Sequence, residues 1–168
     1  MRGVIFDLDG TLIDSLEDIA DAMDHVLDGL GLPRRTREEY ERFIGEGARL
    51  LVRRSVGDRA DLEDEAFAAF RARYFSRLLV STRPYPGVDE LLASLAARGT
   101  PTGVLSNKPH DATVTIVRAL FPDHPFATVV GDREGRRRSP TRPAPSRSRA
   151  PWASRRATSS SSATPPST

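Results

Sequence analysis

Asp7 and Asp9 are the residues whose type and spacing are best suited to chemistry. They follow an apolar run at residues 4–6, and Gly10 behind them allows the backbone to turn sharply. Two crowded carboxylates repel each other unless a cation joins them, which favours Mg²⁺, a hard ion that takes oxygen ligands. One carboxylate can attack phosphorus and form an aspartyl-phosphate, while the other protonates the leaving alcohol and later activates water.

The alternative for a lone Asp-x-Asp is a strand that ends in a solvated acidic turn. Here the pair continues as Asp-x-Asp-Gly-Thr-Leu at the end of an apolar stretch. A catalytic pair explains that longer string better than a polar turn does. We therefore favour the catalytic interpretation.

These carboxylates need a sheet to position them. Residues 4–6 predict a buried strand, residues 102–105 a second and residues 126–130 a third. The second strand ends in Ser106, Asn107 and Lys108, a hydroxyl, an amide and an ammonium that are suited to phosphate oxygens. An ordinary polar turn is equally compatible with that short motif alone. Ligands of open α/β sheets bind beyond the carboxyl ends of the strands, so both groups should meet there.

A helical module separates the first two strands. Ser15 with Asp18, and Thr36 with Glu39, predict capping boxes for the first two helices. A third helix is expected over residues 48–56, and Asp61 is expected to cap a fourth, whose apolar face we interpret as core packing: Phe67, Phe70, Tyr74 and Leu78. An insertion directly after the catalytic strand is suited to act as a lid. Residues 83–87 return the chain to the core, and His110 should begin a structural helix.

The string at residues 7–12 resembles motif I of the haloacid-dehalogenase-like (HAD) phosphohydrolases, and Ser106 to Pro109 resemble motif II. The resemblance implies that Asp7 is the nucleophile and Asp9 the general acid/base, with Mg²⁺ held by both carboxylates. It also implies a set of phosphate-binding residues: Leu8, Gly10, Thr11, Ser106, Asn107 and Lys108. The implied fold is α/β, a Rossmann-like parallel sheet with an inserted α-helical cap.

Two details resemble the phosphoglycolate phosphatase branch, namely Ser-Asn-Lys-Pro in motif II and Ile-Gly-x-Gly at residues 44–47. That branch implies a small phosphorylated metabolite, 2-phosphoglycolate or a similar compound, as the substrate. Gly45, Gly47 and Arg49 would then contact it from the cap. Arg53 and Arg54 are further candidates, although such arginines more often form a solvated helix face. A related sugar-phosphate phosphatase or phosphomutase is the alternative within enzymes.

Composition divides the chain of 168 residues. All 23 acidic residues lie within residues 1–135, whereas residues 136–168 hold eight arginines and no acid. The absence of cysteine excludes disulfides, thiolate zinc sites and cysteine nucleophiles. No signal peptide or membrane-spanning stretch is visible, so we expect a cytoplasmic protein without a membrane partner. No oligomeric state is predicted.

The resemblance weakens after residue 135. The family also needs a lysine at the phosphoryl group and a further Asp for the metal, but Lys108 is the only lysine and belongs to motif II. Gly131-Asp132 precedes the place where that lysine is expected, so the third acidic metal ligand is missing. We therefore expect an incomplete HAD core and a truncated enzyme that is weakly active or inactive.

Residues 136–168 form an Arg/Ser/Pro-rich tail that should be disordered. One interpretation is a basic arm on a non-catalytic protein that binds nucleic acid, a partner that we do not favour. The other is an out-of-frame translation. Shifted by one base, Ser139-Pro140-Thr141 can encode Lys-Pro-Asp, and residues 163–168 can encode Gly-Asp-Ser-Pro-Val-Asp, the two missing motifs. The expected organisation is a core at residues 1–14 and 83–135, a cap at 15–82 and the tail at 136–168.

Overall fold

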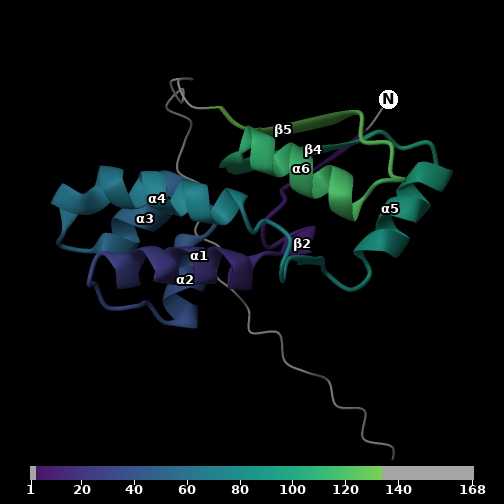
Figure 1. Ribbon diagram of the computed structural model, residues 1–168. Coiled ribbons are helices and arrows are strands. Elements are labelled where there is room, and N and C mark those ends of the chain that lie inside the picture. Colours follow the sequence, from purple (N-terminus) through teal and green to yellow (C-terminus); the bar gives the residue numbers. More distant parts are fainter. Residues whose placement is uncertain (1–2, 134–168) are drawn as a thin grey trace, which may run out of the picture. The chain divides into compact units, whose positions relative to one another are not determined.

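The computed structural model describes residues 3–133, and the expectations for residues 136–168 lie outside this range. Its central sheet contains strands β1 (Val4–Phe6), β4 (Thr102–Pro109) and β5 (Thr128–Asp132), which are parallel and adjacent in the order β1-β4-β5. Phe6 pairs with Val104, so the ends of β1 and β4 reach the same edge of the sheet (Figure 1). The predicted α/β class with a parallel sheet is confirmed.

The prediction that the first strand is buried is wrong. Ile5 is 70% exposed, and within the described part of the sheet β1 pairs only with β4. Leu105 and Val130 are also exposed, and they oppose each other in the register of β4 and β5. Because side chains alternate between the two faces of a strand, the sheet buries Val104 on one face and exposes Leu105 on the other.

Helix α6 (His110–Leu120) covers the buried face, and it begins at His110 as predicted. Gly131 allows this close packing, since a Cβ atom there would lie 2.5 Å from the Thr113 hydroxyl oxygen and 2.6 Å from the His110 Cα. The Gly131 backbone N–H donates to Nδ1 of His110 at 3.2 Å. His110 therefore has a structural role, as expected. Helix α5 (Val88–Ala97) leads into β4.

Two short strands join the ends of the helical module. β2 (Ile13–Asp14) pairs antiparallel with β3 (Arg83–Pro84), so the chain leaves the core and returns to it at neighbouring positions. The sequence predicted only a turn at the return, because two-residue strands are too short to produce a periodic pattern. The helical module is therefore an insertion whose two connections to the core, β2 and β3, are paired with each other.

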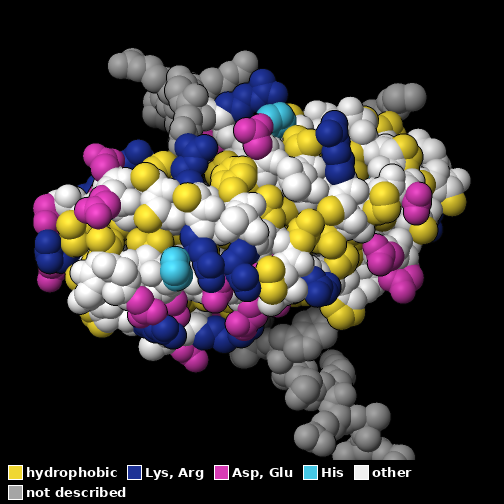
Figure 2. Space-filling model, viewed as in Figure 1, with side chains coloured by type: hydrophobic (Ala, Val, Ile, Leu, Met, Phe, Trp, Pro, Cys, Tyr) yellow, Lys and Arg dark blue, Asp and Glu magenta, His cyan; other side chains and the backbone are white. Residues whose placement is uncertain are grey.

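The module consists of α1 (Leu16–Gly29), α2 (Arg37–Phe43), α3 (Ala48–Val56) and α4 (Glu63–Phe75), with a 3₁₀ turn before α4. Helix α4 packs against α1 and α3 (Figure 1). Its predicted apolar face is buried and includes Phe67, Phe70 and Tyr74. Basic and acidic side chains lie intermixed on the visible face of these helices (Figure 2). The module also has exposed ion pairs, such as Arg34 with Asp28.

One of the three predicted caps is confirmed. The Thr36 hydroxyl accepts from the Glu39 backbone N–H at 3.3 Å, and the Thr36 backbone N–H donates to the Glu39 carboxylate at 2.8 Å. The cap at Asp61 is wrong, since α4 begins at Glu63 and Asp61 pairs with Arg59 in the preceding turn.

Ser15 occupies the N-cap position of α1 as predicted, but the predicted capping box with Asp18 is wrong. Neither side chain caps α1: the Ser15 hydroxyl donates to Asp9, and Asp18 is buried against the return segment. There the Asp18 carboxylate accepts hydrogen bonds from the backbone N–H groups of Ser81 and Thr82. Both side chains therefore form hydrogen bonds outside the helix, although the local sequence predicted that they would cap its end.

Candidate active site

Asp7 and Asp9 lie directly beyond the carboxyl end of β1. Leu8 between them is completely buried and fixes the turn, and Gly10 adopts a φ of 73°, which is unfavourable for a residue with a side chain. The Asp7 carboxylate is exposed and accepts from the Leu8 backbone N–H at 2.8 Å. Because neighbouring side chains point in opposite directions, Leu8 lies in the core and the two carboxylates lie at the sheet edge.

Two donors converge on a single oxygen of Asp9. The Ser15 hydroxyl donates to Oδ1 at 2.6 Å, and the Lys108 ammonium donates to the same oxygen at 2.8 Å. The Lys108 side chain is 3% exposed and that of Asp9 10%, so this ion pair is shielded from water. The only lysine of the chain therefore lies at the centre of the site.

The end of β4 supplies the remaining polar groups. Ser106 is buried, and its hydroxyl accepts from the Lys108 backbone N–H at 3.2 Å. Asn107 donates from its side-chain amide to the Gly45 carbonyl oxygen at 2.8 Å, which connects motif II to the loop before α3. Gly45 and Gly47 both have a φ of 101°, a conformation that favours glycine.

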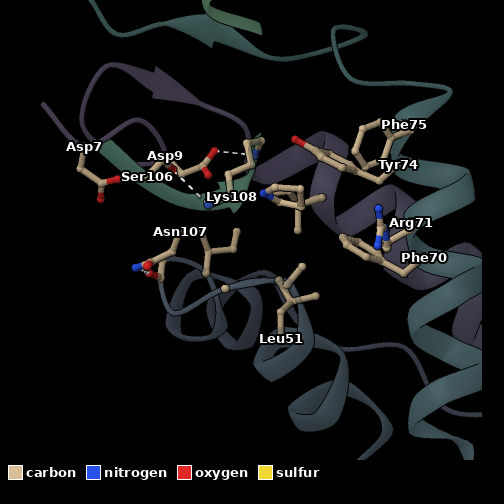
Figure 3. A pocket seen from close by; sticks show the side chains of 16 residues that line it. Asp7, Asp9, Leu51, Phe70, Arg71, Tyr74, Phe75, Ser106, Asn107 and Lys108 are labelled. Carbon is tan, nitrogen blue, oxygen red and sulfur yellow. Dashed lines mark hydrogen bonds and ion pairs between the residues drawn. The ribbon is translucent and has the colours of Figure 1, made fainter. Parts of the chain in front are cut away.

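The helical module forms the opposite wall of the pocket. Phe70, Arg71, Tyr74 and Phe75 of α4 face the two aspartates and the end of β4 (Figure 3). The Arg71 guanidinium lies over the rings of Phe67 and Phe75, with its carbon 5.8 and 5.9 Å from their centroids. The wall is therefore largely apolar, with one cation held against aromatic rings.

Burial and neighbouring charge set the protonation of the site. Burial alone would lower the pKa of Lys108, but the Asp9 carboxylate and Tyr74 outweigh it, and the pKa of Lys108 rises. Burial raises the pKa of Tyr74 against the opposing charge of Lys108, and the Asp9 charge adds to the rise. Lys108 is thus an ammonium and Tyr74 a neutral phenol at physiological pH.

The structure brings most of the expected site residues to one pocket. Its lining includes seven of them: Asp7, Asp9, Gly45, Gly47, Ser106, Asn107 and Lys108. Arg49 is not part of that lining, and it pairs instead with Glu63 and Asp64. The backbone N–H groups of the other three expected phosphate binders all donate within the turn or to Asp7: Leu8, Gly10 and Thr11.

Sequence reasoning missed the wall formed by α4. The apolar periodicity correctly marked Phe70 and Tyr74 as buried, but a helical stripe does not reveal that its end borders a ligand pocket. Arg71 lies one position after Phe70, among other arginines that carried no distinguishing signal. Ser15 was expected to serve a helix end and instead contacts Asp9.

Within residues 3–133, no cluster of three or more His, Cys, Asp or Glu side chains is arranged to hold a metal ion. Asp7 and Asp9 are the acidic side chains in the pocket lining. No helix in this part of the chain has the length and hydropathy needed to span a bilayer.

Comparison with known proteins assigns the fold and the motifs to one family. The chain is 36% identical to a phosphoglycolate phosphatase of Aquifex aeolicus over 131 residues and 38% identical to one of Rhodospirillum rubrum over 155 residues. These alignments cover 78% and 87% of the chain but only 61% and 64% of the two relatives, so the chain spans less than two thirds of their length.

A crystal structure of a predicted phosphoglycolate phosphatase from Haemophilus somnus superposes with a TM-score of 0.72 at 31% identity, covering 78% of this chain and 62% of that one. A sequence model of the haloacid dehalogenase-like hydrolases matches residues 4–144. The match includes the strand that carries Asp7 and Asp9, the helical insertion and the strand that carries Ser106 to Lys108. The chain therefore belongs to the haloacid dehalogenase-like hydrolase family.

Proposed function

We propose that the chain carries the site of a Mg²⁺-dependent phosphomonoester hydrolase that works through an aspartyl-phosphate. The observation that carries this proposal is the convergence of Asp7, Asp9 and Ser106 on one pocket from the ends of two adjacent parallel strands. Family membership supports it independently. Both carboxylates come from the same strand end, one exposed and one held by donors, as two different chemical roles require.

In the first step, an Asp7 carboxylate oxygen attacks phosphorus, and the bond between phosphorus and the ester oxygen breaks. Asp9, protonated on Oδ2 for this step, gives its proton to that oxygen, which leaves as an alcohol. In the second step, Asp9 takes a proton from water, the water oxygen bonds to phosphorus, and the Asp7 oxygen departs with its electron pair. Ser106 and Asn107 are placed to hold phosphoryl oxygens during both steps.

The residues present are compatible with Mg²⁺, although they supply only part of a complete ligand set. Asp7 offers an exposed carboxylate and Asp9 a second one, both hard oxygen donors. When bound, the metal would neutralise charge on the phosphoryl oxygens and the attacking carboxylate. Since Asp7 and Asp9 are the acidic groups of the described pocket, we expect weak metal binding and slow turnover by the 168-residue chain.

We propose 2-phosphoglycolate, or a similarly small carboxylated phosphate ester, as the substrate. Phosphoglycolate phosphatases are among the relatives, and Arg71 lies in the pocket wall opposite the aspartates, where it could bind a carboxylate. Arg49, expected in this role, pairs with Glu63 and Asp64. A small leaving group also suits a pocket closed by Phe70, Tyr74 and Phe75.

A panel of phosphate esters with Mg²⁺ tests the proposal. Release of phosphate should be faster from 2-phosphoglycolate than from glucose 6-phosphate or β-glucose 1-phosphate, and it should stop with EDTA and in Asp7→Asn. A preference for the sugar phosphates would favour a sugar-phosphate phosphatase or phosphomutase instead. Equal phosphate release by the parent chain and Asp7→Asn would refute the hydrolase.

A further inference from the structure

We infer that Lys108 is a positioning residue for Asp9, and that Tyr74 of the cap secures it there. The inference rests on the proposed role of Asp9 as the general acid/base. It extends that role by naming the groups that orient the acid and by connecting them to the cap. Lys108 belongs to the core and Tyr74 to α4, so the arrangement exists only when the two parts are packed together.

The orientation of Asp9 follows from the atoms involved. Lys108 and Ser15 both donate to Oδ1, and neither of them uses Oδ2. A carboxylate held through one oxygen by two donors has little freedom to rotate. Its second oxygen is then the one directed to the reacting ester oxygen or water. General acid catalysis depends on this kind of alignment, because a proton transfers efficiently only at hydrogen-bond distance.

Stability alone gives a poor account of this buried pair. Desolvation of an ammonium and a carboxylate costs several kcal/mol, and apolar residues of similar volume often replace such pairs without loss of stability. The surrounding wall is largely apolar, so two apolar side chains in place of Lys108 and Asp9 would pack against similar surroundings. An ammonium here therefore indicates a role that a methyl group could not fulfil, namely donation to Asp9.

Tyr74 completes the arrangement from the cap side. The Lys108 ammonium lies 4.9 Å from the centroid of the Tyr74 ring, a cation–π distance, and the phenol points toward the Lys108–Asp9 pair (Figure 3). Tyr74 is 3% exposed and stacks on Phe70 at 5.5 Å between ring centroids. The ring excludes water from the ion pair and leaves Lys108 little room to turn away from Asp9.

The inference predicts a loss that depends on the leaving group. An alkyl phosphate needs a proton on its departing oxygen, whereas p-nitrophenolate leaves without one. The Lys108→Met variant should lower kcat/KM about 10²-fold for 2-phosphoglycolate but less than about 10-fold for p-nitrophenyl phosphate. In an Asp9→Asn background, Lys108→Met should add less than about 3-fold for either ester, because both changes act through one group. Tyr74→Leu should reproduce part of the selective loss, and Tyr74→Phe, which keeps the ring, much less of it.

A crystal structure of Lys108→Met provides the readout that does not depend on turnover. We expect the Asp9 carboxylate to rotate away from its position beside Ser15. Arg118→Met, on an exposed position of α6, removes one positive charge as the matched control and should change neither measurement. An equal loss for both esters, or an Asp9 that keeps its position in Lys108→Met, would overturn the inference. A parent chain without any turnover would refute the hydrolase instead, and the crystal structure would still decide the positioning role.

Discussion

The Asp18 carboxylate accepts hydrogen bonds from both the backbone N–H and the hydroxyl of Thr82, at 2.9 and 2.7 Å. Asp18 lies in the first helix of the helical module, and Thr82 in the segment that returns to the core. Ser81 donates its backbone N–H to the same carboxylate at 2.8 Å. One buried carboxylate thus connects the beginning of the helical module to its end, next to the short β2–β3 pair.

Removal of this carboxylate should destabilise the fold. In Asp18→Ala, three donors of Ser81 and Thr82 lose their acceptor, and the two donors of Thr82 are buried. We expect the free energy of unfolding to fall by roughly 3 kcal/mol, because unsatisfied buried donors are costly. Urea denaturation followed by circular dichroism measures it. Asp21→Ala, which removes an exposed partner of Arg73 and Arg77, should cost less than about 1 kcal/mol. Similar losses in the two variants would contradict the role of Asp18.

Arg71 should determine selectivity for a carboxylated substrate. We expect Arg71→Met to raise KM for 2-phosphoglycolate about 10- to 100-fold, the worth of one hydrogen bond between charged groups, and to leave KM for ethyl phosphate nearly unchanged. Steady-state kinetics with the two esters measures the difference. Arg53→Met serves as the control, since Arg53 lies on α3 outside the pocket lining. A parallel rise in KM for both esters would show that Arg71 only shapes the pocket.

The exposed face of the sheet should promote self-association. Ile5, Leu105 and Val130 are 70%, 57% and 38% exposed, and they lie on three adjacent strands. We expect the double variant Ile5→Thr/Leu105→Thr to remain monomeric at concentrations where the parent chain aggregates, since threonine suits a strand but is polar. Light scattering after size-exclusion chromatography measures this. The control Leu91→Thr, at a 46% exposed position of α5, should not improve solubility, and an equal gain from it would argue against a specific role for the sheet.

The composition of residues 136–168 leads to a genetic prediction. If they are an out-of-frame translation, sequencing the coding DNA across codons 135–140 on both strands should reveal a one-base error that shifts the reading frame. The corrected reading should contain Lys-Pro-Asp near residue 139 and a later Gly-Asp motif. A confirmed coding sequence without that shift would instead establish the arginine-rich segment as part of the protein.

The sequence predicted which polar residues share a pocket better than it predicted their surroundings. Asp7, Asp9 and Ser106 could be expected to lie together because the carboxyl ends of parallel strands meet at one edge of the sheet. The apolar run at residues 4–6 alone did not reveal that Ile5 is exposed, because its exposure depends on which strands lie beside β1 rather than on its own apolar character. Ser15 and Asp18 had local signals for a helix cap, yet their side chains bond to partners outside the helix, six residues away for Ser15 and 64 for Asp18.

Lys108 illustrates the same limit. As a sequence feature it was one of three polar residues after a strand, equally suited to phosphate or solvent. Its burial against Asp9 and Tyr74 depends on the packing of α4 over the end of β4, a contact between residues more than 30 positions apart. Side-chain periodicity along one helix contains no information about such a neighbour.

The proposed hydrolase depends above all on the phosphorylation of Asp7. In the most direct measurement, the chain is mixed with Mg²⁺ and ³²P-labelled 2-phosphoglycolate and quenched within seconds in acid. The acyl phosphate is then reduced with borohydride, and the modified residue is identified by mass spectrometry. We predict homoserine at position 7 of the parent chain and no modification in Asp7→Asn. In Asp9→Asn, more label should be trapped before reduction if hydrolysis of the intermediate is slowed more than its formation. An intact Asp7 in a sample that has released phosphate, or a label on another residue, would contradict the account.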